Sequence, residues 1–217
     1  MRRPPLLWAA GASLILSACA GDMVPADKRG GRITPPRYGV NSAEFRQCIG
    51  KLAGLGAQYT PLPDRSFGGG CTVNGAVRLD RISVPVNGIG PMACALAQNF
   101  TAWVRYGVQP AARIYLGSEV VRVDSFGTYA CRNVAGSGRL SEHARANAVD
   151  IAAFLLADGR RISIQNDWYG DEGSRQFLRV VRNSACKRFR TVLSPDYNAA
   201  HHDHLHFDMG GKGAYCR

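Results

Sequence analysis

The sequence predicts an α+β domain in which a small antiparallel sheet is flanked by helices and stapled by disulfides. Helical and strand patterns follow one another without a regular strand–helix–strand alternation, which disfavours a doubly wound parallel sheet. The 217 residues are 46% hydrophobic and 20% charged, as expected for one folded domain and not for a disordered chain. No C-x-x-C pair occurs among the seven cysteines, which favours disulfides over a zinc–thiolate cluster.

Three segments have the periodicity of helices with one buried face. The first covers residues 41–55, with Asn41 as the candidate cap and apolar side chains at helical spacing. The second covers residues 92–107, and we expect it to end at Gly107. The third covers residues 174–189, where apolar positions again recur every three or four residues.

Four shorter segments are expected to be strands. Residues 76–84 and 119–126 alternate between apolar and polar side chains. Residues 148–154 are a strand-like apolar run that contains Asp150, and residues 205–209 form the last strand. A carboxylate within an apolar strand is costly to bury unless a partner pairs with it, and a cation is the most natural partner.

The first residues are predicted to be an export signal and not part of the fold. Arg2 and Arg3 precede an apolar stretch, residues 6–16, that is too short to span a bilayer as a stable helix. The following sequence LSAC resembles the lipobox of bacterial lipoproteins. We therefore expect residues 1–18 to be a signal peptide and Cys19 to become the lipid-modified first residue.

Residues 19–38 are rich in proline, glycine and charge and are expected to tether the lipid to a folded domain of residues 39–217. Ala20 follows Cys19 where some lipoproteins have an aspartate. By resemblance to bacterial lipoproteins this favours an anchor in the outer membrane, at the periplasmic face of the envelope. The alternative is ordinary secretion with Cys19 unpaired.

The chain is basic, with a formal net charge of +11. Without the two arginines of the signal peptide, 25 basic and 16 acidic residues remain. This excess suits a polyanionic partner such as a cell-wall polymer or an anionic lipid, although a solvated surface also shows scattered basic residues. Nucleic acid is not an expected partner, because the chain is exported and has no basic run interleaved with aromatics. The oligomeric state is not predicted.

Four of the five histidines lie between His201 and His206. Short histidine-rich runs also occur in solvated turns, so a polar loop is the alternative to a functional site. Strand alternation places His204, His206 and Asp208 on one face. Geometry alone allows both of these histidines to bind one metal, or one to bind while the other transfers protons. His201 and His202 precede the strand, and solvated or supporting positions are expected for them.

The fifth histidine, His143, precedes Asp150 by seven residues. Catalytic zinc sites are assembled from three nitrogen or oxygen ligands on separate segments, with one open position. His143, Asp150 and the histidines of the last strand supply such a set. The sequence therefore favours a metal site over a solvated loop.

Several segments resemble the extensin-like carboxyl-terminal domain family of bacteria: SEHARANAVDI and HDHLHFDM, framed by YACRNVAG and FLRVVRNSACKRFRTVLSPDYN. The resemblance covers essentially residues 40–217. That family is in turn similar to the zinc peptidases of the D-alanyl-D-alanine carboxypeptidase and lysostaphin group, which share S-x-H-x-x-G-x-A-x-D followed by H-x-H. The resemblance to these families implies a zinc-peptidase-like fold. It also implies that the protein is a metallopeptidase that hydrolyses amide bonds in peptidoglycan stem peptides or cross-links.

Carried over position by position, the pattern begins at Ser141 and implies two catalytic residues. His204 becomes the residue that carries protons, and Arg132 resembles an arginine that faces the developing oxyanion. The glycine of the pattern is replaced here by Ala146, and if this position has φ > 0, alanine costs about 1 kcal/mol. The alternative function is a non-catalytic, envelope-binding lipoprotein that retains a metal. The implied ligands, for one Zn²⁺ per chain, are His143, Asp150 and His206.

The resemblance also includes the six cysteines that remain once Cys19 is assigned to lipid. Proximity in the sequence, supported by this resemblance, suggests that neighbours pair in order and that the last bond ties the end of the chain to the third helix. The predicted disulfides are Cys48–Cys71, Cys94–Cys131 and Cys186–Cys216.

Overall fold

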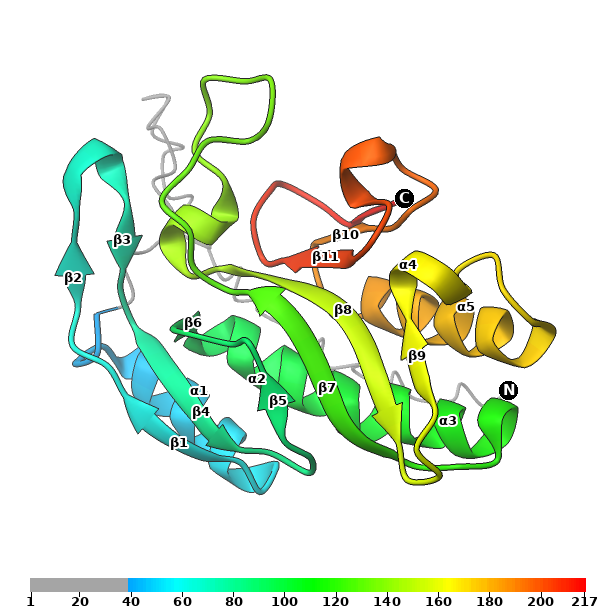
Figure 1. Cartoon of the computed structure of the whole chain (residues 1–217). Coiled ribbons are helices and arrows are strands. Elements are labelled where there is room, and N and C mark those ends of the chain that lie inside the picture. Colours follow the sequence, from blue (N-terminus) through cyan, green and yellow to red (C-terminus); the bar gives the residue numbers. More distant parts are fainter. Residues whose placement is uncertain (1–38) are drawn as a thin grey trace, which may run out of the picture. The chain divides into compact units, whose positions relative to one another are not determined.

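The computed structural model describes residues 39–217 of the chain. The predicted signal peptide (1–18), the lipid-modified Cys19 and the tether (19–38) lie outside the described residues. Residues 39–217 form a mixed α+β fold with several sheets and three disulfides, drawn in Figure 1. Within this part of the chain, no helix has the length and apolar character needed to cross a membrane.

A seven-stranded sheet forms the centre of the fold, in the order β12-β10-β11-β8-β7-β5, with β9 also paired to β8. The ladders that involve β8 or β11 are antiparallel, as the sequence predicts. The outer ladders, β5 with β7 and β10 with β12, are parallel. The strands are β5 (Val86–Asn87), β7 (Val120–Gly127), β8 (Ala148–Leu156), β9 (Arg161–Ser163), β10 (Thr191–Leu193), β11 (Leu205–Asp208) and β12 (Tyr215–Cys216).

Two smaller sheets are formed by strands that precede β7 in the chain. The first has the order β1-β4-β6 and the second pairs β2 with β3. Their strands are β1 (Gln58–Pro61), β2 (Arg65–Ser66), β3 (Thr72–Val73), β4 (Ala76–Arg81) and β6 (Met92–Ala93). Three short 3-10 helices lie in the connecting loops: η1 (Gly68–Gly70), η3 (Glu142–Arg145) and η4 (Ala199–His201).

The helices cover one side of the central sheet, and the core lies between them and the strands (Figure 1). Trp103 contacts Phe207 of β11 and Phe154 of β8, at ring-centroid distances of 5.0 and 6.1 Å, and Phe154 in turn contacts Phe177. These four rings are fully buried and join two helices to the two central strands. The helices are α1 (Ala43–Gly54), α2 (Cys94–Trp103), α3 (Gln109–Leu116), α4 (Ile164–Asp167) and α5 (Glu172–Cys186).

A register shift in the β7–β8 ladder reverses the faces of β8. Asp124 pairs with Ala153 but Ser125 pairs with Ile151, so β8 has one extra residue at this point, which is a β-bulge. Phe154 consequently joins Phe207 on the helix side, although strict alternation would place it on the face of Asp150. The bulge therefore lets one continuous apolar strand contribute to the core at one end and to a polar face at the other.

The expected end of the second helix at Gly107 is wrong. The helix continues from α2 through a π-helical segment, Val104–Val108 (η2), into α3, and ends at Gly117, which has φ 64°. A Cβ on Gly107 would overlap the Ser184 hydroxyl of α5. Glycine is needed here for close helix packing and not for termination. The cap of α1 also differs, since the hydroxyl of Ser42, and not Asn41, accepts from the Phe45 amide.

Two of the three predicted disulfides are wrong. The observed bonds are Cys48–Cys94, Cys71–Cys131 and Cys186–Cys216, so only the last matches the prediction. α1 packs against α2, and this brings Cys48 beside Cys94 across the intervening β1–β4 hairpin. The predicted Cys48–Cys71 and Cys94–Cys131 bonds followed proximity in the sequence, which does not report such helix packing.

Replacing Gly107 by alanine is expected to destabilise the fold by about 1–3 kcal/mol, because the added methyl group overpacks the contact with Ser184. Gly50→Ala in α1 is the matched control. Gly50 is an exposed helical glycine with open space at its Cβ position, so alanine there should stabilise by about 0.5–1 kcal/mol. Urea unfolding followed by circular dichroism measures both. Equal effects of the two substitutions would contradict the packing role of Gly107.

Candidate metal centre

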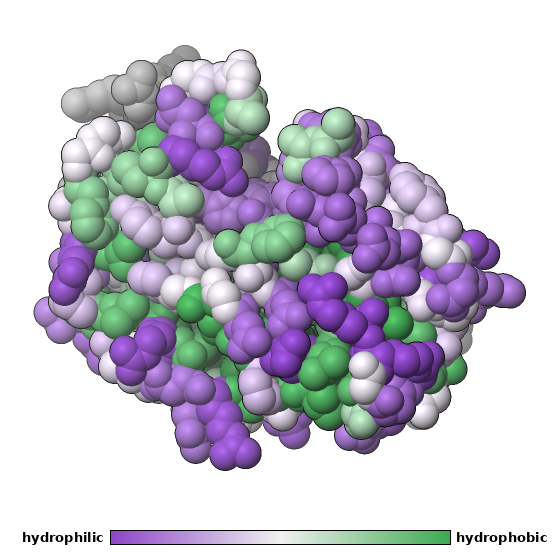
Figure 2. Space-filling model, viewed as in Figure 1, coloured by the Kyte–Doolittle hydropathy of each residue, from purple (hydrophilic) through white to green (hydrophobic). Residues whose placement is uncertain are grey.

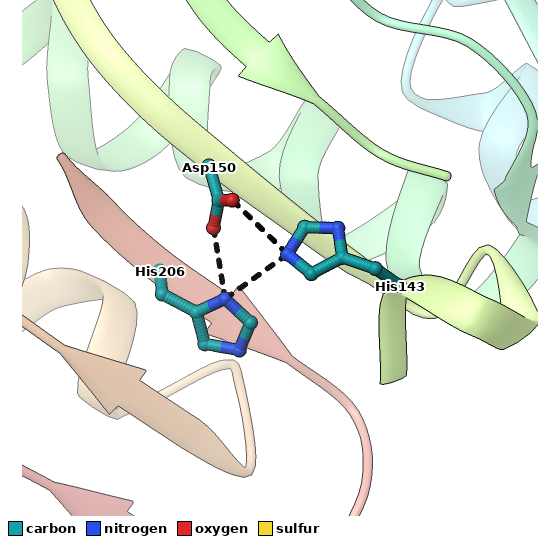
Figure 3. A group of neighbouring side chains, drawn as sticks. All are labelled: His143, Asp150 and His206. Carbon is teal, nitrogen blue, oxygen red and sulfur yellow. Dashed lines mark hydrogen bonds and ion pairs between the residues drawn. The ribbon is translucent and has the colours of Figure 1, made fainter. Parts of the chain in front are cut away.

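The three predicted metal ligands meet on the polar side of the central sheet. His143 lies in η3, Asp150 in β8 and His206 in β11. β8 and β11 pair antiparallel with His206 directly opposite Asp150, so both side chains leave the same face of the sheet. Figure 3 shows His143 reaching toward them from the side. Chain topology thus brings together residues that are up to 63 positions apart.

The separations between the candidate ligand atoms fit a tetrahedral metal. His143 Nε2 is 3.1 Å from Asp150 Oδ2 and 3.3 Å from His206 Nδ1, which is 2.8 Å from Asp150 Oδ1. Two ligands about 2.0–2.1 Å from a zinc ion at the tetrahedral angle are roughly 3.3 Å apart. The three donors therefore stand nearly at the spacing that zinc requires, with only small outward shifts.

Outer partners fix the tautomers of both histidines. His143 Nδ1 lies 3.3 Å from the Thr128 carbonyl oxygen, which can only accept, so this nitrogen carries the proton and Nε2 presents its lone pair to the site. His206 Nε2 donates to Asp208 Oδ2 at 3.0 Å, which leaves Nδ1 for a metal. Metal-binding histidines typically donate their other N–H to a carboxylate or carbonyl in this way. Both rings are therefore oriented as ligands.

Burial and charge make the site suited to a cation. Burial raises the pKa of Asp150, but the adjacent imidazole rings of His143 and His206 outweigh it and hold this pKa well below its usual range. Burial lowers the pKa of His206, but its hydrogen bonds to Asp150 and Asp208 raise the net value to about 9. Without a metal, a protonated His206 thus links two buried carboxylates. A bound cation can take the place of that proton.

The loop that carries His143 contains the position where the family pattern has glycine. The Ser141 hydroxyl accepts from the His143 amide at 3.3 Å and caps η3. Ala146, which ends η3, has φ 53° and is the sole non-glycine residue with positive φ among residues 39–217. Its methyl group is fully buried against Val73 and Ala76. This contact offsets part of the strain of about 1 kcal/mol, so the loop keeps its shape with alanine.

His204 lies beside the three ligands, immediately before β11. Its Nδ1 donates to Asp203 Oδ1 at 2.9 Å, so its Nε2 is left with a lone pair, 3.7 Å from Asp150 Oδ1. The ring also contacts the exposed ring of Phe126 edge-on at 6.0 Å. A histidine with one nitrogen held by a carboxylate and the other facing the site is arranged as a general base.

The remaining histidines differ from each other. The His201 ring lies 5.0 Å from that of His204 and 6.0 Å from that of His206, so it belongs to the wall of the site. Burial and the neighbouring His204 lower the pKa of His201 to about 4. The His202 side chain is 63% exposed, with Nδ1 bonded to the Ala199 carbonyl oxygen and Nε2 3.9 Å from Asp203 Oδ2. Arg132 is exposed, and its side chain makes no hydrogen bond or ion pair within the described residues, although its charge acts on His201.

The surface above the metal centre is notched. Figure 2 shows a gap between two raised parts of this face, bordered mainly by hydrophilic residues. In Figure 1 the same gap lies between the loop before η3 and the segment that contains η4. Asp203 and Thr128 border the centre and were not predicted. Thr128 acts through its backbone carbonyl, which no sequence pattern can mark.

The family model described as "Extensin-like protein C-terminus" matches residues 46–217 of the chain. No curated protein and no solved structure gave a match. The matched range contains the three candidate ligands, His204 and all six disulfide cysteines.

Alanine at His143, Asp150 or His206 is expected to remove most of the bound metal, because two protein ligands remain in each variant. His202→Ala is the matched control, since this exposed histidine is expected to leave metal content unchanged. Elemental analysis of the purified proteins after dialysis against zinc measures the content. Retention of one zinc per chain by any of the three ligand variants would remove that residue from the metal centre.

Asp208→Asn is expected to weaken zinc affinity by about 10–100-fold without removing a ligand. Asp208 accepts from His206 through Oδ2 and from the Gly210 amide through Oδ1, and asparagine has only one acceptor oxygen for both. Asp203→Asn, which alters the partner of His204, should change the affinity little. Competition with a chelating dye measures the dissociation constants. Equal affinities in Asp208→Asn and wild type would show that Asp208 does not orient the ligand.

Proposed function

The chain belongs to the extensin-like C-terminal family, and from this premise we propose that it is a zinc-dependent peptidase acting on amide bonds in peptidoglycan stem peptides or cross-links. The observation that carries the proposal is the buried His143, Asp150 and His206 cluster with His204 held beside it. A structural zinc site needs four closed ligands, whereas this one offers three and a basic nitrogen at its edge.

His143, Asp150 and His206 would hold the metal, with Thr128 and Asp208 fixing the two rings. Zinc in such a site supplies Lewis acidity and makes water a nucleophile near neutral pH. Every proton movement is assigned to His204. Asp203 fixes its tautomer, so Nε2 can accept a proton and later return it to the leaving amine.

Arg132 is proposed to face the negative charge that develops on the carbonyl oxygen. It follows Cys131, and the Cys71–Cys131 disulfide ties the start of its loop to the segment before β3. Its charge already reaches His201 at the wall of the site. No hydrogen bond or ion pair within residues 39–217 holds the guanidinium, so it is proposed to be positioned by the substrate.

The proposed location is the periplasmic face of the envelope, with the lipid on Cys19 anchoring the protein to the outer membrane. The three disulfides support an oxidising compartment outside the cytoplasm. Peptidoglycan, the proposed partner, is accessible from that position and carries the negative charges that a basic protein attracts.

A non-catalytic envelope-binding lipoprotein is the second candidate. It is favoured by one observation, namely that the exposed Arg132 guanidinium forms no hydrogen bond or ion pair with residues 39–217 at the site. In that function the metal would stabilise the fold and peptidoglycan would bind without being cut.

Incubation of the full mature chain with isolated peptidoglycan, followed by mass spectrometry of the fragments, separates the two candidates. Wild type with zinc is expected to release new peptide fragments. His204→Ala should keep about one zinc per chain while hydrolysis falls by about 10²–10⁴-fold, because general acid–base catalysis is lost. His202→Ala should match wild type in both measurements.

Two outcomes would contradict this scheme. Loss of zinc in His204→Ala would make both histidines ligands and leave the proton carrier unassigned. Full zinc content in wild type with no cleavage of any stem peptide or cross-link would select the non-catalytic candidate.

A further inference from the structure

A hollow of about 380 Å³ lies where α5 and β12 meet and is not used by the proposed chemistry. One wall comes from α5, another from β12 and the third from the residues that follow β10. In Figure 1 the carboxyl end of the chain lies beside the segment after β10, where these elements meet. The lining residues are Arg182, Asp196, Tyr197, Tyr215, Cys216 and Arg217.

The one side-chain carboxylate that lines this hollow, that of Asp196, already accepts hydrogen bonds from other groups. Asp196 Oδ1 accepts from Trp168 Nε1 at 2.9 Å and from the Tyr169 hydroxyl at 3.0 Å. Its Oδ2 accepts from Arg179, whose guanidinium stacks over the Trp168 ring. Asp196 therefore neutralises Arg179 and makes no hydrogen bond to Arg182.

Two arginines face the hollow without a carboxylate partner among residues 39–217. The Arg182 Nε is the single buried side-chain nitrogen or oxygen in this range without a hydrogen-bond partner, and the guanidinium bonds only to Asn183. Arg217 lies 5.5 Å from the Tyr215 ring centroid and forms no ion pair there. Burial lowers the pKa of Arg182, the nearby charge of Asp196 raises it, and the charges of Arg179 and Arg217 lower it. The unpartnered Arg182 nitrogen, with Arg217 in the same lining, offers hydrogen-bond donors and positive charge to an anion.

The hollow is preorganised. The Cys186–Cys216 disulfide joins β12 to α5, and Cys186 lies one helical turn after Arg182. The Arg217 amide also donates to the Val192 carbonyl oxygen, which fixes the backbone opposite the helix. Because the backbone that carries the two arginines is held before a ligand arrives, less backbone entropy is lost on binding.

Aromatic rings connect the hollow to the metal centre. Tyr197 lines the hollow, and its ring lies 5.5 Å from that of His201, which lies 6.0 Å from that of His206. These two steps limit the Tyr197–His206 separation to about 12 Å. An extended peptide advances roughly 3.3–3.6 Å per residue, so about three or four residues cover this distance.

We infer that this hollow is a subsite for a carboxylate of the peptide whose amide bond lies at the metal centre. The inference rests on the proposed function. Arg182 and Arg217 would bind the carboxylate oxygens through charge-assisted hydrogen bonds, and Tyr197 would pack along the connecting peptide. The substrate class is therefore an acidic peptide whose carboxylate lies beyond the residues that pass Tyr197. A phosphate group offers similar oxygens, and the test includes it.

The test is a binding cycle on the full mature chain in the His204→Ala background, which limits hydrolysis. The probes are a tetrapeptide of the peptidoglycan stem with free carboxylates, the same peptide with its carboxylates amidated, and inorganic phosphate. Calorimetry gives the affinities, and the Nε–H resonance of Arg182 reports the location. Lys187→Gln is the control, because it removes the same charge from an exposed position one turn beyond the hollow.

The acidic peptide is expected to shift the Arg182 resonance and to bind about tenfold or more tighter than the amidated peptide. Arg182→Gln and Arg217→Gln should each remove most of that difference, and Lys187→Gln should leave it unchanged. Equal binding of the two peptides to the protein with both arginines would overturn the inference, even if an arginine variant fails to fold. Binding of phosphate alone in the hollow would also overturn it and assign the site to phosphate.

The outcomes also separate this inference from the proposed function. Binding through Arg182 without cleavage of peptidoglycan by wild type would contradict the proposed peptidase function and support the subsite. Cleavage by wild type with an unchanged KM in Arg182→Gln, together with equal peptide affinities, would reject only the subsite.

Discussion

The site depends on one buried carboxylate in the middle of a strand. Asp150 lies between apolar neighbours in β8, where an unpaired charge would cost several kcal/mol. His206 on the adjacent strand and His143 from η3 satisfy it, and Thr128 and Asp208 in turn satisfy these two rings. Removing any member leaves a buried polar group without a partner. This mutual dependence, and not the metal alone, explains why the cluster is assembled before a cation binds.

The same strands must also build the core. β11 solves this by alternation, with His206 facing the site and Phe207 facing Trp103. β8 cannot do so with alternation alone, because Asp150 and Phe154 are an even number of residues apart. The bulge between them changes the face, so the carboxylate stays on the polar side while Phe154 reaches the helices. The same β-bulge therefore sets the position of Asp150 in the site and that of Phe154 in the core.

The ligand triad was predictable because its signals are local and because the family pattern supplies the connection between segments. Asp150 stands out inside an apolar run, and alternation places His204, His206 and Asp208 together. The incorrect predictions concern features that depend on packing between elements distant in the sequence. Gly107 resembles a helix end, but its role depends on Ser184 in another helix. The Cys48–Cys94 bond depends on how α1 meets α2, and the hollow depends on where the chain end lies, which no local pattern encodes.

Two of the disulfides lie at the borders of the metal centre and not beneath it. Cys71–Cys131 fixes the start of the loop that carries Arg132, and Cys186–Cys216 fixes the wall that carries Arg217. The ligands themselves are held by strand pairing and hydrogen bonds, which need no covalent support. Loops at the edge of a sheet have fewer such constraints, so cross-links there limit the positions of groups that contact substrate. The hydrogen-bonded sheet thus positions the candidate ligands, and the disulfides restrain the segments at the border of the site.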